Sequence, residues 1–193
     1  MSSDESAPRQ RLLAEVVRVM TENGSTGWSL RSLAEATGTS HRMLIYHFAS
    51  LDGVLLAVVR LIDDDARDRF AAVAAEHGDQ LTAARAWWRQ LADPERAAGE
   101  RLYFELYAAA LQGKSFAQPL LRGAVTDWLP PLTAAFTELT GQSDPAHTDA
   151  RLGVAVVRGL LLDLLATGDL AAVTAAHERY LGLYANTREQ QPD

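Results

Sequence analysis

Apolar residues recur every three or four positions along almost the whole chain, and this spacing limits the fold to packed helices. In the segment that begins at Pro8, Leu12, Val16 and Met20 lie four residues apart and therefore share one helix face. No segment alternates apolar and polar residues as a half-buried strand would, and the strong helix formers Ala and Leu dominate. We therefore predict an all-α fold for the 193 residues.

Capping residues and helix breakers divide this pattern into nine predicted helices. Ser29 and Ser40 can each cap a short helix, and Asp93-Pro94 and Asp144-Pro145 can each start a longer one. Pro130 and Pro131 should kink the helix that contains them. The nine ranges are 8–23, 30–37, 41–47, 51–76, 79–91, 94–113, 118–140, 145–167 and 169–187.

The composition excludes several classes of enzyme. The chain contains no Cys, which rules out disulfides, thiolate metal sites and cysteine catalysis. Its five His residues are scattered without metal-ligand spacing, and glycine-rich phosphate loops and nucleophile elbows are absent. We therefore expect a protein that is not an enzyme, with no catalytic residues, no metal and no cofactor.

The apolar segments are too short for a membrane span. The longest, from Leu152 to Leu165, is interrupted by Arg158 and Asp163 and falls short of the roughly 18 residues that a span needs. The first ten residues carry no apolar signal core. We expect a cytoplasmic protein without a membrane partner.

The charge is distributed unevenly along the chain. Between Ala7 and Arg60 there are six basic and four acidic residues, a net charge of +2. From Leu61 onward, 12 basic residues stand against 19 acidic ones, a net charge of −7. Only the N-terminal segment is therefore suited to approach a phosphate backbone, although so mild an asymmetry does not by itself indicate DNA binding.

The stretch Leu30–Phe48 has the features of a helix-turn-helix. Ala34 is small enough for two helices to cross closely, and Gly38 can adopt the positive φ that the turn needs. Apolar residues can lock the pair onto a third helix: Leu30, Leu33, Leu44 and Phe48. The second helix would then present its first side chains to a major groove. The alternative is an ordinary antiparallel helix pair, with Ser40 only a cap and His41 and Arg42 only solvated.

The segment from Ser29 to Leu55 resembles the DNA-binding signature of the tetracycline-repressor (TetR) family of bacterial transcriptional regulators. Matches at fixed spacing carry the resemblance: Ser29, Arg31, Leu33, Ala34, Gly38, Thr39, Ser40, Leu44, Tyr46, His47, Phe48, Ser50 and Leu55. The first seven residues are predicted to be a disordered tail. The resemblance implies a DNA-binding domain over 8–50, a connecting helix over 51–76 and a ligand-binding and dimerisation domain over 77–193. The implied DNA-binding residues are Ser29, Arg31, Thr39, Ser40, His41, Arg42, Met43, Tyr46 and His47.

Three positions depart from the family pattern. Arg42 replaces the usual Gly early in the recognition helix and adds a donor for a guanine edge or a phosphate. Ile45 replaces a Tyr and Leu51 replaces a Lys, so the phosphate contacts made by those two residues in the family are not expected here. Arg9 and Arg11 are candidates to assist from the N-terminal arm.

The last two predicted helices carry apolar residues that can pair with their own copies in a four-helix bundle. The predicted dimer interface consists of Val154, Val157, Leu161, Leu165, Val173, His177, Tyr180 and Tyr184. The alternative is that both helices pack only within one chain. Arg158 lies inside this seam and can pair across the interface or with Asp163.

Aromatic residues gather in the middle of the chain. The resemblance implies a ligand pocket there, for which the candidates are Trp87, Tyr103, Phe104, Tyr107 and Trp128. Such residues suit a small hydrophobic or aromatic ligand, although aromatics at helical spacing are more often core. Glu105 and Arg101 are expected to form a surface pair.

Together these features predict a homodimeric repressor that a small ligand releases from a palindromic DNA operator. Two alternatives stay open at this point: an activator, or a ligand-binding and dimerisation module with weak or no DNA binding.

Overall fold

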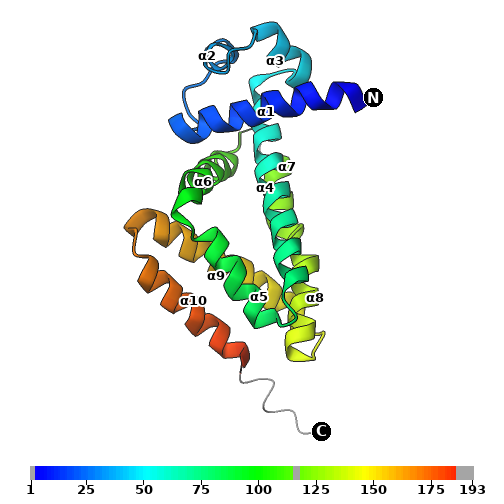
Figure 1. Ribbon diagram of the computed structural model, residues 1–193, viewed down its shortest axis with the longest axis vertical. Helices are drawn as coiled ribbons and strands as arrows, with labels where there is room; N and C mark the ends of the chain where they lie inside the picture. Colours follow the sequence, from blue (N-terminus) through cyan, green and yellow to red (C-terminus); the bar gives the residue numbers. More distant parts are fainter. Residues whose placement is uncertain (1–2, 115–117, 186–193) are drawn as a thin grey trace. The chain divides into compact units, whose positions relative to one another are not determined.

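The computed structural model describes residues 3–114 and 118–185, and in this part of the chain every regular element is a helix (Figure 1). This confirms the all-α prediction. The helices are α1 (Ser3–Asn23), α2 (Leu30–Ala36), α3 (His41–Phe48), α4 (Leu51–Glu76), α5 (Gln80–Leu91), the 3₁₀ helix η1 (Pro94–Arg96), α6 (Ala97–Leu111), α7 (Gln118–Thr126), α8 (Leu129–Thr140), α9 (Ala146–Thr167) and α10 (Leu170–Ala185).

The helices form two compact units. Unit 1 contains the chain up to Asp65 together with Ala98–Arg122, and unit 2 contains Ala66–Ala97 together with the chain from Gly123 onward. The chain passes from one unit to the other within α4. Unit 1 thus includes α6, which the sequence assigned to a separate C-terminal domain beginning at residue 77.

The core of unit 1 is built from the apolar faces of α1 to α4. Val16 and Met20 of α1, Leu33 of α2 and Leu44 of α3 are all fully buried. On α4, Val54 and Val58 are equally inaccessible. Figure 1 shows α2 and α3 on the same side of α1, which supplies the third helix that a helix-turn-helix requires.

Two predicted boundaries are wrong. Helix α1 begins at Ser3, so residues 3–7 are not a loose tail, and Pro8 lies inside the helix and not in its first turn. The predicted single helix over 118–140 is two helices, because the chain breaks at Asp127-Trp128 and Pro130 then starts α8. The predicted end of the last helix at Thr187 lies outside the described residues.

Unit 2 packs α8, α9 and α10 with α5. One cluster of its buried side chains consists of Leu139, Tyr180, Leu181 and Tyr184. Gly153 of α9 packs closely against this cluster, because a Cβ there would lie 3.1 Å from the Tyr180 hydroxyl oxygen.

Within residues 3–114 and 118–185, no helix alone combines the length and apolar character of a membrane span. The pair α3 and α4, bent by 64° between them, meets that criterion only when both are counted together.

Candidate nucleic-acid interface

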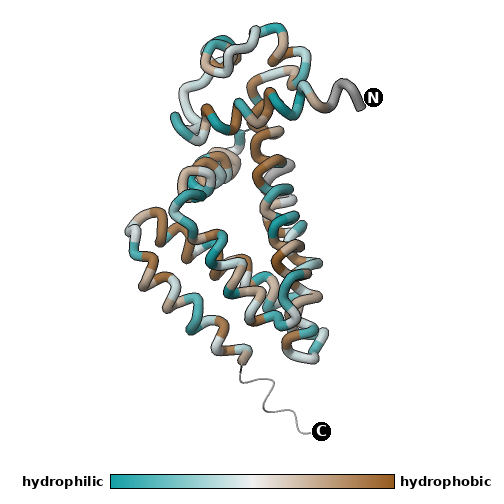
Figure 2. Tube along the Cα trace, viewed as in Figure 1, coloured by the Kyte–Doolittle hydropathy of each residue, from teal (hydrophilic) through white to brown (hydrophobic). Residues whose placement is uncertain are grey.

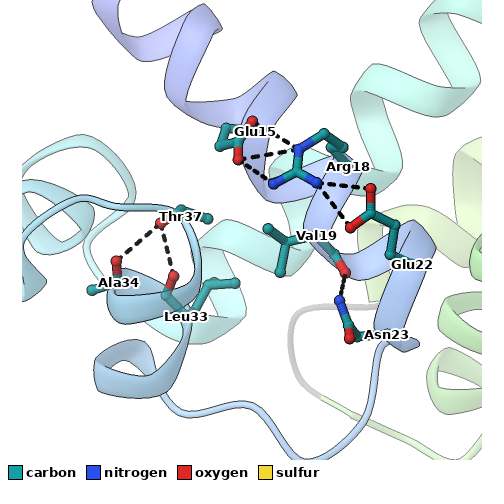
Figure 3. Close-up of polar contacts among 8 residues, drawn as sticks. All are labelled: Glu15, Arg18, Val19, Glu22, Asn23, Leu33, Ala34 and Thr37. Carbon is teal, nitrogen blue, oxygen red and sulfur yellow. Dashed lines mark hydrogen bonds and ion pairs between the residues drawn. The ribbon is translucent and has the colours of Figure 1, made fainter.

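The turn between α2 and α3 is formed by local hydrogen bonds. Gly38 adopts a φ of 65°, its N–H donates to the Glu35 carbonyl at 3.3 Å, and the Thr39 N–H donates to the Ala34 carbonyl at 2.9 Å. This pair of bonds is the Schellman motif, which ends a helix at a residue that tolerates positive φ. The Thr37 hydroxyl also donates to the Leu33 carbonyl at 2.7 Å (Figure 3). The turn is therefore encoded by residues within one short segment.

Both helices of the motif start at a serine cap. The Ser29 hydroxyl accepts from the Ser32 N–H at 3.1 Å, and the Ser32 hydroxyl accepts in return from the Ser29 N–H at 2.9 Å. The Ser40 hydroxyl accepts from the Met43 N–H at 3.2 Å. Both serines were predicted to contact DNA, and both remain exposed while they cap their helices.

Helix α3 buries one side and exposes the other. Leu44 and Phe48 face the core, at 0% and 6% exposure. His41 and Arg42 are exposed, as are Met43 at 39%, Ile45 at 43% and Tyr46 at 64%. His47 is half-buried, with its ring 4.9 Å from the Tyr46 ring. The exposed surface thus combines a cation, an imidazole, a phenol and two apolar chains.

The other predicted contact residues lie beside this surface. Arg31 on α2 is exposed over 86% of its side chain and forms a loose ion pair with Glu35, with 3.5 Å between Nε and Oε1. A pair this exposed contributes little to stability, so the guanidinium is available for a phosphate. Thr39 is half-buried in the turn.

Helix α1 contacts the end of α3 through Arg9. The Arg9 guanidinium lies over the Phe48 ring, 5.0 Å from its centroid, and its Nε donates to the His47 carbonyl at 3.5 Å. Arg9 was a candidate for the DNA-binding arm, and the structure assigns it this packing contact. On the same helix, Arg18 bridges Glu15 and Glu22 (Figure 3), and its hydrogen bond lowers the pKa of the Glu15 carboxyl.

The junction of α3 with α4 is sterically tight. Ala49 has a φ of 66° and a ψ of −39°, and the Ser50 N–H donates back to the Phe48 carbonyl at 2.8 Å, which makes a γ-turn. The Ser50 hydroxyl then accepts from the Gly53 N–H at 3.0 Å and caps α4. A Cβ at residue 53 would overlap the Phe48 carbonyl oxygen. The position of α3 relative to the start of α4 therefore depends on glycine at 53.

Glu105 of α6 contacts the loop that precedes α2. Its carboxylate accepts from the Ser25 N–H at 2.8 Å and from the Ser25 hydroxyl at 2.7 Å. The sequence predicted only a local pair with Arg101, because a partner 80 residues away leaves no periodic signal. This contact links α6 to the helix-turn-helix inside unit 1.

The five predicted pocket residues fall into two groups. On α6 in unit 1, the Tyr103 ring lies 5.6 Å from Phe104 and 6.1 Å from Tyr107. In unit 2, the Trp87 and Trp128 rings are 6.1 Å apart, and Phe70 lies within 5.7 Å of both. The Arg69 guanidinium covers the Trp87 ring at 5.4 Å. Each group is an aromatic cluster, and the pocket itself stays a prediction.

Most of the predicted dimer residues lie in the core of unit 2. Such burial leaves these side chains little surface for a second copy, and the interface named from the sequence stays a prediction. The buried ones are Val154, Leu161, Val173, His177, Tyr180 and Tyr184, while Val157 and Leu165 are half-buried. His177 stacks on Trp88 of α5, with ring centroids 4.8 Å apart. Arg158, also in this seam, donates to the Ala124 carbonyl.

A different face of α9 and α10 is exposed. Hydrophobic residues recur at intervals along α10 (Figure 2), and several on both helices point to solvent. On α9, exposed residues three or four positions apart lie on one face of the helix, and α10 shows the same spacing. We call this set the α9–α10 stripe: Leu152, Ala155, Gly159, Leu162 and Ala166 on α9, and Ala172, Ala176, Arg179 and Leu183 on α10.

In the described part of the chain, no three His, Asp or Glu side chains are arranged to hold a metal ion. The surfaces that the described structure exposes are the outer face of α3 and the α9–α10 stripe.

Comparison with solved structures places this fold among transcriptional regulators. A transcriptional regulator from Rhodococcus sp. RHA1 is 26% identical, with a TM-score of 0.77 over 91% of this chain and 95% of its own. The multidrug binding protein EbrR, solved with imidazole, is 28% identical, with a TM-score of 0.67 over 92% of this chain and 89% of its own. A TetR-family regulator from Pectobacterium atrosepticum is 21% identical, with a TM-score of 0.73 and 95% coverage of each chain.

No protein-family model matches the sequence, and no curated protein matches it significantly. The structural similarity nevertheless extends over at least nine-tenths of the chain in each of these three cases. The resemblance to the TetR family, whose motif lies between Ser29 and Leu55 in the sequence, is thereby confirmed and extends to the fold as a whole.

Proposed function

We propose that this chain, which has the fold of the TetR-family regulators, is a DNA-binding transcriptional repressor that a small hydrophobic or aromatic molecule releases from its operator. One observation carries the proposal. Leu44 and Phe48 anchor α3 to the core, so that His41, Arg42, Met43 and Tyr46 stand exposed on one helix after a serine cap. A second helix of a helix-turn-helix that exposes its first side chains in this way can enter a major groove.

Arg42 is the residue with the best chemistry for base recognition. It lies in the first turn of α3, next to the exposed His41. Its guanidinium can donate two hydrogen bonds to the O6 and N7 atoms of one guanine. Arg31, on the neighbouring α2, is placed for a phosphate, and the exposed Ser29 and Ser40 hydroxyls can contact the backbone beside it.

A palindromic operator requires two recognition helices about 34–36 Å apart, and therefore a dimer. We propose that the α9–α10 stripe forms its interface. On α9 the stripe offers leucines separated by Ala and Gly, and on α10 it offers two alanines and a leucine together with Arg179, so that two copies of the helix pair can approach across a two-fold axis. Leu162, exposed at 49%, lies near the middle of the α9 row.

The Glu105 contact offers a route for ligand response within unit 1. Glu105 lies on α6 between Phe104 and Tyr107, which were predicted to line the pocket, and its carboxylate binds Ser25 just before α2. A ligand that packs against the aromatic residues of α6 and shifts this helix would move or break that contact. The ligand then lowers operator affinity by its preference for the shifted state.

Selection of bound sites from random duplex DNA tests the proposed function directly. The full chain should recover a palindrome, and Arg42→Ala should weaken binding to it. Arg60→Ala, an exposed arginine on α4, is the matched control and should bind like the unaltered protein. Recovery of no preferred sequence would contradict the proposal.

Gel shifts on the selected duplex test the ligand response. The compounds to screen are apolar aromatic molecules and imidazole, with which EbrR was solved. Glu105→Ala should bind the duplex without ligand but respond less to an active compound, whereas Arg101→Ala, one turn away on α6, should respond fully. Equal responses of both variants would remove the Glu105 contact from the mechanism.

A further inference from the structure

We infer that Ile45 reads the C5-methyl group of a thymine in each operator half-site. The inference rests on the proposed function and adds to it a specificity residue that the family signature does not supply, since the family has a tyrosine at this position. It begins from the exposure of Ile45, an aliphatic side chain that is 43% accessible on α3.

The core of unit 1 does not need Ile45 as an anchor. Leu44 and Phe48 already hold α3, at 0% and 6% exposure. Among the large hydrophobic side chains that the described structure exposes, Met43, Ile45 and Tyr46 lie within four consecutive residues of this eight-residue helix. Such a cluster indicates a surface that becomes covered by a partner.

The neighbours of Ile45 identify that partner. Ile45 lies three residues after Arg42 and four after His41, so all three side chains are adjacent on the helix surface. When Arg42 and His41 enter a major groove, Ile45 enters with them. The Cβ atoms of an i, i+3 pair are about 5–6 Å apart, and base pairs rise by about 3.4 Å. The contact with Ile45 therefore lies within about two base pairs of the Arg42 contact.

Only one feature of the groove suits an aliphatic side chain. Guanine, adenine and cytosine edges present donors and acceptors, and covering them with isoleucine would leave those groups without hydrogen bonds. The thymine methyl is the apolar group that the major groove displays. The same reasoning excludes a phosphate contact, because isoleucine cannot donate a hydrogen bond.

Replacing thymine by deoxyuridine tests the inference, because it removes the methyl group and nothing else. In the selected operator, each thymine is replaced in turn, symmetrically in both half-sites. One position near the Arg42 contact should lose about fourfold in affinity per half-site, the value expected for one buried methyl group. For Ile45→Ala, the thymine and deoxyuridine duplexes should bind equally at that position.

Two control variants isolate the role of Ile45. Leu61→Ala removes an exposed leucine from α4, and Met43→Ala removes the neighbouring apolar chain on α3; both should keep the preference for thymine. A bound palindrome that is indifferent to every deoxyuridine substitution would overturn this inference alone. So would a methyl preference that persists in Ile45→Ala. Failure to bind any duplex would overturn the proposed function and this inference with it.

Discussion

The helix-turn-helix and the α9–α10 pair carry similar apolar patterns, but they differ in where the partners of their apolar faces lie. In α2 and α3, caps, turn and packing lie within 20 residues, and the residues expected to be buried are buried: Leu33, Leu44 and Phe48. In α9 and α10, the apolar residues predicted to meet a second copy are instead packed within the chain. A periodic pattern shows that a helix has an apolar face, but not which partner covers it.

The difference arises from how much apolar surface each helix carries. Helix α3 is short, and its two core residues leave the rest of its surface polar or mixed. Helix α9 has 22 residues and is apolar on more than one side, with Val154 and Leu161 buried and Leu152 and Leu162 exposed. A helix that is apolar on two sides can pack against two partners, and we propose that a second copy of the chain is the partner of the exposed side.

The largest effect is expected for Leu162→Arg in the α9–α10 stripe. Each protomer would bury an unpaired arginine near the two-fold axis, and such a charge costs several kcal/mol, about 3–5 for each broken site. Sedimentation should show monomers, and operator affinity should fall because each half-site is then bound singly. Leu111→Arg, on an exposed leucine of α6, should stay dimeric. A dimeric Leu162→Arg protein would contradict the assigned interface.

Arg42→Ala should have the next largest effect and sharpens the account of α3. Loss of a bidentate guanine contact costs about 1–3 kcal/mol in each half-site, or roughly 5- to 150-fold in affinity per half-site. Fluorescence anisotropy on the selected operator measures this loss. Specificity should relax at the one base position that Arg42 contacts. If site selection with the Arg42→Ala protein returned the same sequence, Arg42 would have no role in reading that base.

Gly53→Ala tests the tight junction that positions α3. The new methyl group would overlap the Phe48 carbonyl oxygen, so we expect a loss of about 1–3 kcal/mol in the free energy of unfolding. Gly99→Ala on α6 meets no atom within 4 Å and should stabilise by about 0.5–1 kcal/mol. Urea unfolding of both variants gives the comparison. Equal stabilisation by both would mean that the junction is looser than described.

His177 provides the smallest effect and tests the burial of α10. Desolvation lowers the pKa of its imidazole from the ordinary 6.5, opposed by Glu178 on the same helix and assisted by Arg85 of α5. As the pH falls, the unfolded chain therefore binds a proton at His177 before the folded chain does. The contribution of the neutral imidazole to the free energy of unfolding is complete above pH 6.5 and is lost as the pH falls through the folded pKa.

His177→Phe should preserve the stack on Trp88 and remove that dependence. Between pH 7.5 and pH 5.5, the unaltered protein should lose more stability in urea than the variant does. Other titrating groups act on both proteins equally, so the difference reports His177. If the two proteins lost the same stability over this pH range, the His177 imidazole would be exposed to solvent and would be available to a dimer contact.

Local chemistry explains what could be predicted from the sequence. Gly38 and the serine caps act on neighbouring residues, and the helix-turn-helix was therefore predicted with the right helices. The break between α7 and α8 is local: Pro130 was expected to kink one helix, and it lies instead at the start of α8. The association of α6 with unit 1 and the Glu105–Ser25 bond depend on residues far apart in the chain. No spacing rule encodes them. The packing of Arg9 on Phe48 was missed for the same reason, since the two residues lie on different helices.

The affinity of the full chain for its selected palindrome, relative to a scrambled duplex of equal length, tests the central claim most directly. At each salt concentration, the chain should bind the palindrome at least about 10³-fold more tightly than the scrambled duplex. The logarithm of each affinity should fall linearly with the logarithm of the salt concentration. Equal affinities for the two duplexes at every salt concentration would contradict the claim that the exposed face of α3 reads DNA.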